Sequence, residues 1–115
     1  MNNKKQCSFD VERRGGEVEL ILHGEIDHHC AVRVRTDMDR LLLEEHPRKA
    51  ILDLSHIDFM DSSGLGLIMG RYALMQRLGG ELTLRNPNPR IVKIFELAGL
   101  GRMVKIEESP KEEQA

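Results

Sequence analysis

Residues 57–72 read IDFMDSSGLGLIMGRY and contain an abrupt change of pattern. The stretch begins as an apolar, strand-like run and continues as a helix, because Leu65, Ile68 and Tyr72 recur at spacings of three and four residues. Two adjacent serines and two glycines occupy the junction, DSSGLG. A strand that runs directly into a helix is typical of α/β proteins, so we predict an α/β fold with a polar junction at the end of one strand.

The residues before this stretch predict a hairpin, a helix and a buried strand. Residues 8–13 and 17–23 alternate apolar and polar side chains around a Gly-Gly turn, which is typical of a β-hairpin. Residues 30–45 change to apolar positions at helical spacing, with Asp27 placed to cap the helix. Residues 49–54, KAILDL, form a short apolar run that predicts a buried strand.

The residues after the stretch continue the alternation. ELTL at residues 81–84 predicts a strand, Pro87 and Pro89 begin a third helix, and residues 103–106 are compatible with a last short strand. The order predicts a mixed sheet of four to five strands, with an N-terminal hairpin. Right-handed crossover helices would make its later strands parallel.

A single domain is expected over residues 1–115, with its ordered core at about residues 8–107. The length falls in the usual range for one domain, and no linker interrupts the alternation. The polar, charged tail at residues 108–115 is expected to be disordered.

The composition argues against several kinds of partner. The 17 Lys and Arg residues stand against 19 Asp and Glu, a net charge of −2, and three Phe, one Tyr and no Trp offer bases little to stack on, so nucleic acid is not expected. The sequence has no signal-peptide run and nothing near the roughly 18 apolar residues of a membrane span, so we expect a cytoplasmic protein without a membrane partner. Cys7 and Cys30 are then expected to be reduced, in or near the core, rather than joined.

Two junctions at the predicted carboxyl edge of the sheet are chemically unusual, because ligands and partners gather at that edge. They are GEIDHH at residues 24–29 and DFMDSSGLG at residues 58–66. A hydrolase would need the nucleophile elbow GxSxG, whereas the serines here precede both glycines. We therefore expect no catalytic residue and no enzyme activity.

The glycines of the second junction raise the question of a phosphate cradle. Gly64, Gly66 and Gly70 follow a strand and open a helix, but the spacing is a loose GxGxxxG and no Lys lies in the loop. We favour the interpretation that Gly66, Gly70 and Ala73 form a small-residue face that lets the helix pack closely on a neighbour.

The first junction raises the question of a metal site. Asp27, His28 and His29, with His23 or His56, are ligand types, but adjacent histidines point in different directions and no second ligand pair stands at a typical spacing. We favour Asp27 as a helix cap and the histidines as a solvated or partner-facing surface. No metal or other cofactor is expected.

The two serines suggest a phosphorylation site. If Ser62 is the N-cap, its hydroxyl binds the amides of the first turn and Ser63 keeps an exposed hydroxyl. A phosphate there would add a charge of roughly −1.5 to −2, favoured by the helix dipole but crowded by Asp61. From the residues alone, this hypothesis stands even with the interpretation that both serines merely cap the helix, and swapping the cap would swap the exposed serine.

IDFMDSSGLGLIMGRY together with GEIDHH resembles the signature of the STAS domain family, and within it the bacterial anti-sigma factor antagonists. The likeness covers residues 9–106 or so, in the expected order of elements. The histidine pair and GRY bring it nearest to the branch that acts on the sporulation sigma factor F. An antagonist of a general-stress or other sigma factor is the alternative, and a small nucleotide-binding protein is a more distant one.

The resemblance implies a partner-switching protein. In this family the unmodified antagonist binds an anti-sigma factor that is also a serine kinase, which releases the sigma factor. The kinase phosphorylates the second serine of DSSG, here Ser63, and a PP2C-type serine phosphatase restores the unmodified form. ATP and Mg²⁺ belong to the partner kinase, so this chain is expected to be a substrate and a binder.

The resemblance also implies a set of contact residues. Asp61 would help to present Ser63, Gly64 would leave room for the kinase active site, and Leu65 would add apolar contact. The first junction would give a second patch. The expected partner-binding residues are Asp27, His28, His29, Asp61, Ser62, Gly64 and Leu65.

Overall fold

The computed structural model describes residues 7–108 of the chain. The elements are β1 (Ser8–Arg14), β2 (Glu17–Ile26), α1 (His28–Glu45), β3 (Lys49–Met60), α2 (Ser62–Arg77), β4 (Glu81–Arg85), α3 (Pro89–Leu97) and β5 (Lys105–Glu107). Their order confirms the predicted alternation, and the short strand expected near residues 103–106 is β5. The disorder predicted for the tail concerns residues 109–115, which lie outside the described residues.

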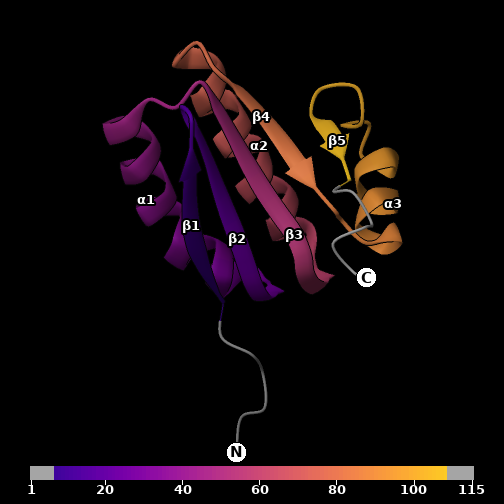
Figure 1. Cartoon of the computed structure of the whole chain (residues 1–115). Coiled ribbons are helices and arrows are strands. Elements are labelled where there is room, and N and C mark those ends of the chain that lie inside the picture. Colours follow the sequence, from indigo (N-terminus) through magenta and orange to yellow (C-terminus); the bar gives the residue numbers. More distant parts are fainter. Residues whose placement is uncertain (1–6, 109–115) are drawn as a thin grey trace, which may run out of the picture.

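The strands form one five-stranded sheet in the order β1-β2-β3-β4-β5 (Figure 1). β1 and β2 are antiparallel, and each later neighbour is parallel to the strand before it, so the predicted mixed sheet is confirmed. α1 packs against β1 and β2, and α2 packs against β3 and β4. Because strand order follows chain order, every crossover steps in the same direction along the sheet. Right-handed crossovers of this kind bring their helices to one face.

The core lies between that face and the helices. Every second residue of β2, from Val18 to Ile26, is buried, and the intervening residues are half-buried. α1 presents a buried stripe at helical spacing, Cys30, Val34, Met38 and Leu42. Each of these residues is at most 4% exposed. Period two in the strand and a three-to-four-residue period in the helix therefore meet in one apolar layer.

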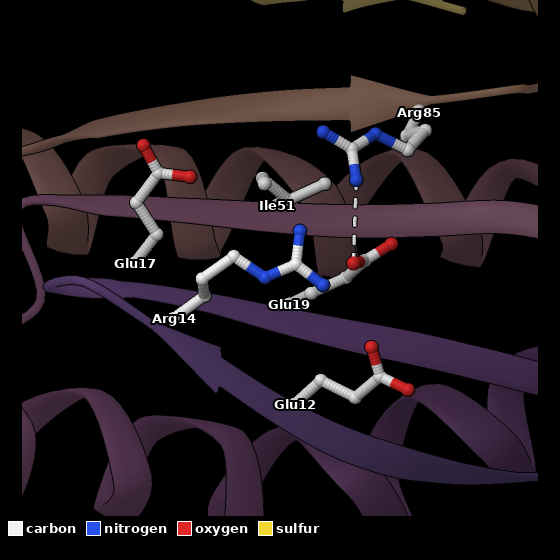
Figure 2. A pocket seen from close by; sticks show the side chains of 6 residues that line it. All are labelled: Glu12, Arg14, Glu17, Glu19, Ile51 and Arg85. Carbon is white, nitrogen blue, oxygen red and sulfur yellow. Dashed lines mark ion pairs between the residues drawn. The ribbon is translucent and has the colours of Figure 1, made fainter. Parts of the chain in front are cut away.

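The other face of the sheet, which we call the open face, carries paired charges. A shallow hollow there is lined by Glu12, Arg14, Glu17, Glu19, Ile51 and Arg85 (Figure 2). Arg85 on β4 lies 3.2 Å from Glu19 of β2 and 2.5 Å from Glu107 of β5. The hollow measures about 40 Å³, room for little more than water, and the guanidinium of Arg85 in its lining is already paired with Glu19 and Glu107.

Cys7 and Cys30 are joined by a disulfide, so the expectation that they are reduced is wrong in this structure. Both lie in the core, as predicted, at 5% and 3% exposure. Cys7 immediately precedes β1 and Cys30 lies in the first turn of α1, and the packing of α1 on β1 brings their Cα atoms to 5.3 Å. A separation of 23 residues gives no local signal of that approach.

The small-residue face of α2 does not pack on a neighbour. A Cβ added at Gly66 or Gly70 would meet nothing within 4 Å, and Ala73 is exposed. The predicted close packing through this face is therefore wrong. The helix packs through larger side chains instead, because its buried positions include Leu67, Ile68, Arg71, Leu74 and Met75.

Candidate functional site

The two polar junctions lie side by side, as the sheet-edge argument predicts. β2 and β3 are parallel neighbours, and Ile26 pairs with Met60 at their ends. The amide of Asp61 donates to the carbonyl of Ile26 at 3.1 Å, which ties the second junction to the first. The carboxyl ends of two adjacent strands therefore hold GEIDHH and DSSGLG on one edge.

β3 extends well beyond its neighbour β4. The strand predicted at residues 49–54 is therefore longer in the structure, Lys49–Met60. Its pairing with β4 ends where Asp53 meets Arg85, whereas its pairing with β2 continues to Met60. On the other side, Nδ2 of the Asn88 side chain donates to the carbonyl of Ile57 at 3.1 Å. The DSSG junction thus stands beyond the end of β4, on a strand held from both sides.

Asp61, rather than Ser62, caps α2. Its backbone is extended (φ −97°, ψ −170°), and its Oδ1 accepts from the amide of Ser63 at 2.8 Å. The sequence had left open which serine caps the helix, and in the structure neither does. Aspartate is as good a cap as serine, and here it occupies the last extended position before the helix. The cap consequently requires neither serine hydroxyl.

The exposure of the two serines differs from the predicted one. Ser62 is exposed, and Ser63 is half-buried in the first turn of α2. Because Asp61 bonds the Ser63 amide, its carboxylate lies close to any group attached to Ser63. A phosphate on Ser63 would meet the positive end of the α2 dipole and the negative charge of Asp61 together.

Gly64 has a structural role in the core. It is buried, and a Cβ at this position would collide with the side chain of Met60 and come within 3.2 Å of Ile26 Cγ2. The space that glycine leaves is therefore filled by the protein's own core. Its expected role in a partner interface stays a prediction. Leu65, next along the helix, is half-buried, which agrees with partial exposure at the helix start.

Asp27 caps α1 as predicted. Its Oδ1 accepts from the amide of Cys30 at 2.9 Å, and its carbonyl accepts from the amide of Ala31 at 2.9 Å. His28 and His29 follow the cap and are both exposed, with ring centroids 6.1 Å apart and the rings edge-on. The first junction therefore presents two imidazoles at the surface beside the DSSG junction.

His23 and His56, the other histidines considered above as metal ligands and disfavoured there, form a separate pair on the sheet. His23 stacks on His56 with ring centroids 4.9 Å apart, and its Nε2 lies 3.0 Å from Oδ2 of Asp10. Across residues 7–108, no group of three or more His, Cys, Asp and Glu side chains is placed to hold a metal ion. The absence of a cofactor stays a prediction.

Two apolar side chains near the junctions in sequence are exposed, which the sequence did not predict. Phe59, two residues before Asp61, is 48% exposed, and Val32, one turn after His28, is 49% exposed. The signal for Phe59 was its place beside Met60, since adjacent strand residues face opposite sides. Phe59 therefore lies on the open face of the sheet, whereas Val32 lies on the solvent side of α1.

The chain was compared with known proteins. Residues 8–113 match the STAS domain. The anti-sigma F factor antagonist of Paenibacillus polymyxa is 36% identical over 98 residues, which cover 85% of this chain and 84% of that protein. The anti-sigma-B factor antagonist of Bacillus subtilis is 29% identical over 99 residues, covering 86% and 89%.

Solved structures agree with this likeness. The anti-sigma factor antagonist SpoIIAA in its unphosphorylated form superimposes with a TM-score of 0.78 at 30% identity, over 93% of this chain and 92% of that one. SpoIIAA in its phosphorylated form gives a TM-score of 0.72 at 30% identity, over 93% and 96%. No helix within residues 7–108 is long and apolar enough to cross a membrane. The five-stranded mixed sheet, the order of elements and the family match together show that this chain belongs to the STAS domain family and, within it, is similar to the anti-sigma factor antagonists.

Proposed function

We propose that this chain is an anti-sigma factor antagonist that works by partner switching. In its unphosphorylated form it binds an anti-sigma factor with serine kinase activity and so frees a sigma factor. One observation carries the proposal: DSSG lies at the surface beside the exposed histidine pair, and Asp61 supplies the helix cap, so no serine hydroxyl is needed for it. The family match and the likeness to anti-sigma factor antagonists support the same function.

Ser63 is the proposed phosphoacceptor, and the kinase supplies ATP and Mg²⁺. Phosphorylation would add a charge of roughly −1.5 to −2 at the centre of the contact surface. The α2 dipole stabilises that charge within the helix, so the fold stays nearly unchanged, whereas a formed interface would meet it next to the carboxylate of Asp61. Release of the partner follows from repulsion and steric clash. A PP2C-type serine phosphatase would restore binding, and the cycle would take place in the cytoplasm.

The sporulation sigma factor F is the proposed target. The histidine pair and GRY favour it, as does 36% identity to an anti-sigma F factor antagonist against 29% to an anti-sigma-B factor antagonist. A general-stress sigma factor is the alternative. The two are separated by offering the chain both kinds of anti-sigma factor in competition and measuring which one it binds more tightly.

The acceptor site is tested with three proteins: wild type, Ser62→Ala and Ser63→Ala. Each is incubated with ATP, Mg²⁺ and the purified anti-sigma kinases of both systems, and added phosphate is located by mass spectrometry. We expect phosphate on wild type and Ser62→Ala and none on Ser63→Ala. Loss in Ser62→Ala alone would move the acceptor to the more exposed serine. No phosphate on wild type with either kinase would contradict partner switching.

A further inference from the structure

The Cys7–Cys30 disulfide joins the start of β1 to the helix turn that carries the histidine pair. Cys30 lies two residues after His28, in the first turn of α1, and its amide donates to Oδ1 of Asp27 at 2.9 Å. Cys7 immediately precedes β1. The bridge therefore holds the same turn that the Asp27 cap organises.

A second contact also holds Cys7 against α1. The guanidinium of Arg33, one turn further along α1, donates to the carbonyl of Cys7. The bridge and this hydrogen bond thus attach the residue before β1 to the first two turns of α1. Without the bridge, the Arg33 contact and the Asp27 cap would remain, so the turn would form but with one restraint fewer.

We propose that Cys7 and Cys30 are a thiol–disulfide switch that sets the order of the first turn of α1, and through it the affinity of the surface formed by His28 and His29. In the oxidised form the bridge holds the turn in the arrangement described above. In the reduced form the first turn of α1 unfolds more often, and Cys7 separates from α1 more often. The effect on affinity rests on the proposed function, whereas the effect on the turn does not.

The chemistry requires a low-molecular-weight disulfide such as glutathione disulfide as the oxidant. One cysteine thiolate attacks it, forming a mixed disulfide and releasing one thiolate; the second cysteine then displaces the other thiolate and closes the protein disulfide. Two S–H bonds are lost from the protein and two thiols are released, so electrons and protons balance. Cys7 and Cys30 are only 5% and 3% exposed, so their sulfurs react only when Cys7 moves away from α1. Thiol–disulfide exchange is therefore slow.

The expected size of the effect follows from chain entropy. A cross-link between residues 23 apart restricts the unfolded chain and lowers the equilibrium constant for unfolding by about three hundredfold. A turn ordered in advance also loses less side-chain freedom when a partner binds. Ordering one or two side chains beforehand corresponds to about three- to tenfold tighter binding.

The first measurement uses the full chain and no partner. The protein is equilibrated in glutathione buffers from reducing to oxidising, remaining thiols are blocked with N-ethylmaleimide, and the intact mass is measured. Hydrogen exchange at Cys30 and Ala31, whose amides bond to Asp27, then reports the turn. In oxidising buffer we expect a mass without added N-ethylmaleimide, because the disulfide leaves no thiol to block. After reduction with dithiothreitol, we expect hydrogen exchange at the Cys30 and Ala31 amides to be about tenfold faster.

Two controls isolate the bridge. Exchange at the Gly64 amide, which bonds to the carbonyl of Asp61 in the first turn of α2, should not change with redox state. Cys7→Ser should exchange at Cys30 and Ala31 at one rate in both buffers. Two thiols still open to blocking in oxidising buffer, or equal exchange at Cys30 and Ala31 in both forms of wild type, would overturn the proposal.

The second measurement is the affinity of both forms for the anti-sigma kinase used in the phosphorylation experiment. Tighter binding by the oxidised form supports the switch. Equal binding by both forms, with different exchange, would overturn the link between the turn and affinity. If neither form binds, the proposed function fails, while the exchange difference continues to support redox control of the turn.

Discussion

At the scale of single residues, the candidate site depends on what each side chain of DSSG does in the helix start. Asp61 takes the cap, Gly64 fills a buried position against Met60, and the serines between them are left at the surface with different exposure. Small and polar residues in one short run thus serve separate purposes. Ser62 is exposed, and Asp61 and Ser63 are half-buried.

The role of Gly64 leads to a prediction about stability. Gly64→Ala should lower the free energy of unfolding by about 1–3 kcal/mol, because the new Cβ collides with the side chain of Met60. Gly66→Ala is the matched control in the same helix. Its Cβ meets nothing within 4 Å, so it should raise stability by up to about 1 kcal/mol through helix propensity. Urea unfolding of both variants measures the difference, and equal effects would refute the packing argument.

The charge of a phosphate at Ser63 leads to a prediction about binding. In the presence of ATP and the anti-sigma kinase, Ser63→Ala should stay bound, because it keeps a small side chain that cannot be modified. Ser63→Asp should weaken binding less than phosphorylation does, because one carboxylate has less charge and fewer acceptor oxygens than a phosphate. Calorimetric titration of each variant measures this. Ser63→Asp binding as weakly as phosphorylated wild type would contradict the expected ranking.

Among the elements, α1 and α2 meet through an ion pair between a buried arginine and a half-buried aspartate. Arg71 of α2 is 5% exposed, and its Nε lies 2.8 Å from Oδ1 of Asp39 on α1 without the alignment of a hydrogen bond. Its two terminal nitrogens contact Oδ2 of Asp39 at 3.4 Å and the carbonyl of Leu67 at 3.2 Å. Burial lowers the pKa of Arg71, and the charge of Asp39 opposes that change. The pair therefore sets how α2 lies against α1, the two helices whose first turns form the site.

Breaking this pair from one side should be costly. Asp39→Ala leaves the buried Arg71 without its countercharge and should cost about 3 kcal/mol of stability, reduced where water reaches the half-exposed Asp39 position. The double variant Asp39→Ala/Arg71→Met removes both charges and keeps an apolar side chain in the interface. It should be more stable than Asp39→Ala alone. Thermal unfolding of both variants at pH 7 tests this, and a double variant less stable than the single one would contradict it.

At the scale of the whole molecule, the open face joins strands that are far apart in the chain through charge. Arg85 bridges Glu19 of β2 and Glu107 of β5, and Lys49 of β3 lies 3.7 Å from Glu107. The hydrogen bond from Arg85 lowers the pKa of Glu107. Burial, and a hydrogen bond with Asp53, raise the pKa of Glu19. Acid protonates both carboxyls, but their pKa shifts have opposite signs, so acidification has opposite effects on their contributions to stability.

The lowered pKa of Glu107 determines the sign of a pH effect. Its charged form is favoured in the folded state, so its contribution to stability is present above its usual pKa of 4.5 and is lost as the pH falls through the lower folded value. Glu107→Gln should thus be less stable than wild type at pH 7, by less than about 1 kcal/mol because the pair is partly solvated. The difference should shrink below pH 4.5 or so. Urea unfolding between pH 7 and 3 measures it, and a difference that grows on acidification would show the opposite sign.

Local sequence signals predict the order of elements, the N-terminal hairpin, the Asp27 cap and the sheet edge that holds both junctions. These features depend on periodicity, turn residues and caps, which act over a few neighbouring residues. Three other features follow only from the folded structure: the Cys7–Cys30 bridge, the burial of Gly64 against Met60 and the solvent-facing side of α2. Each of these features depends on contacts made when helices pack on the sheet. The spacing of residues along the chain does not predict such contacts. The choice of Asp61 over Ser62 as the cap lies between the two, because both residues can cap and the end of β3 selected one.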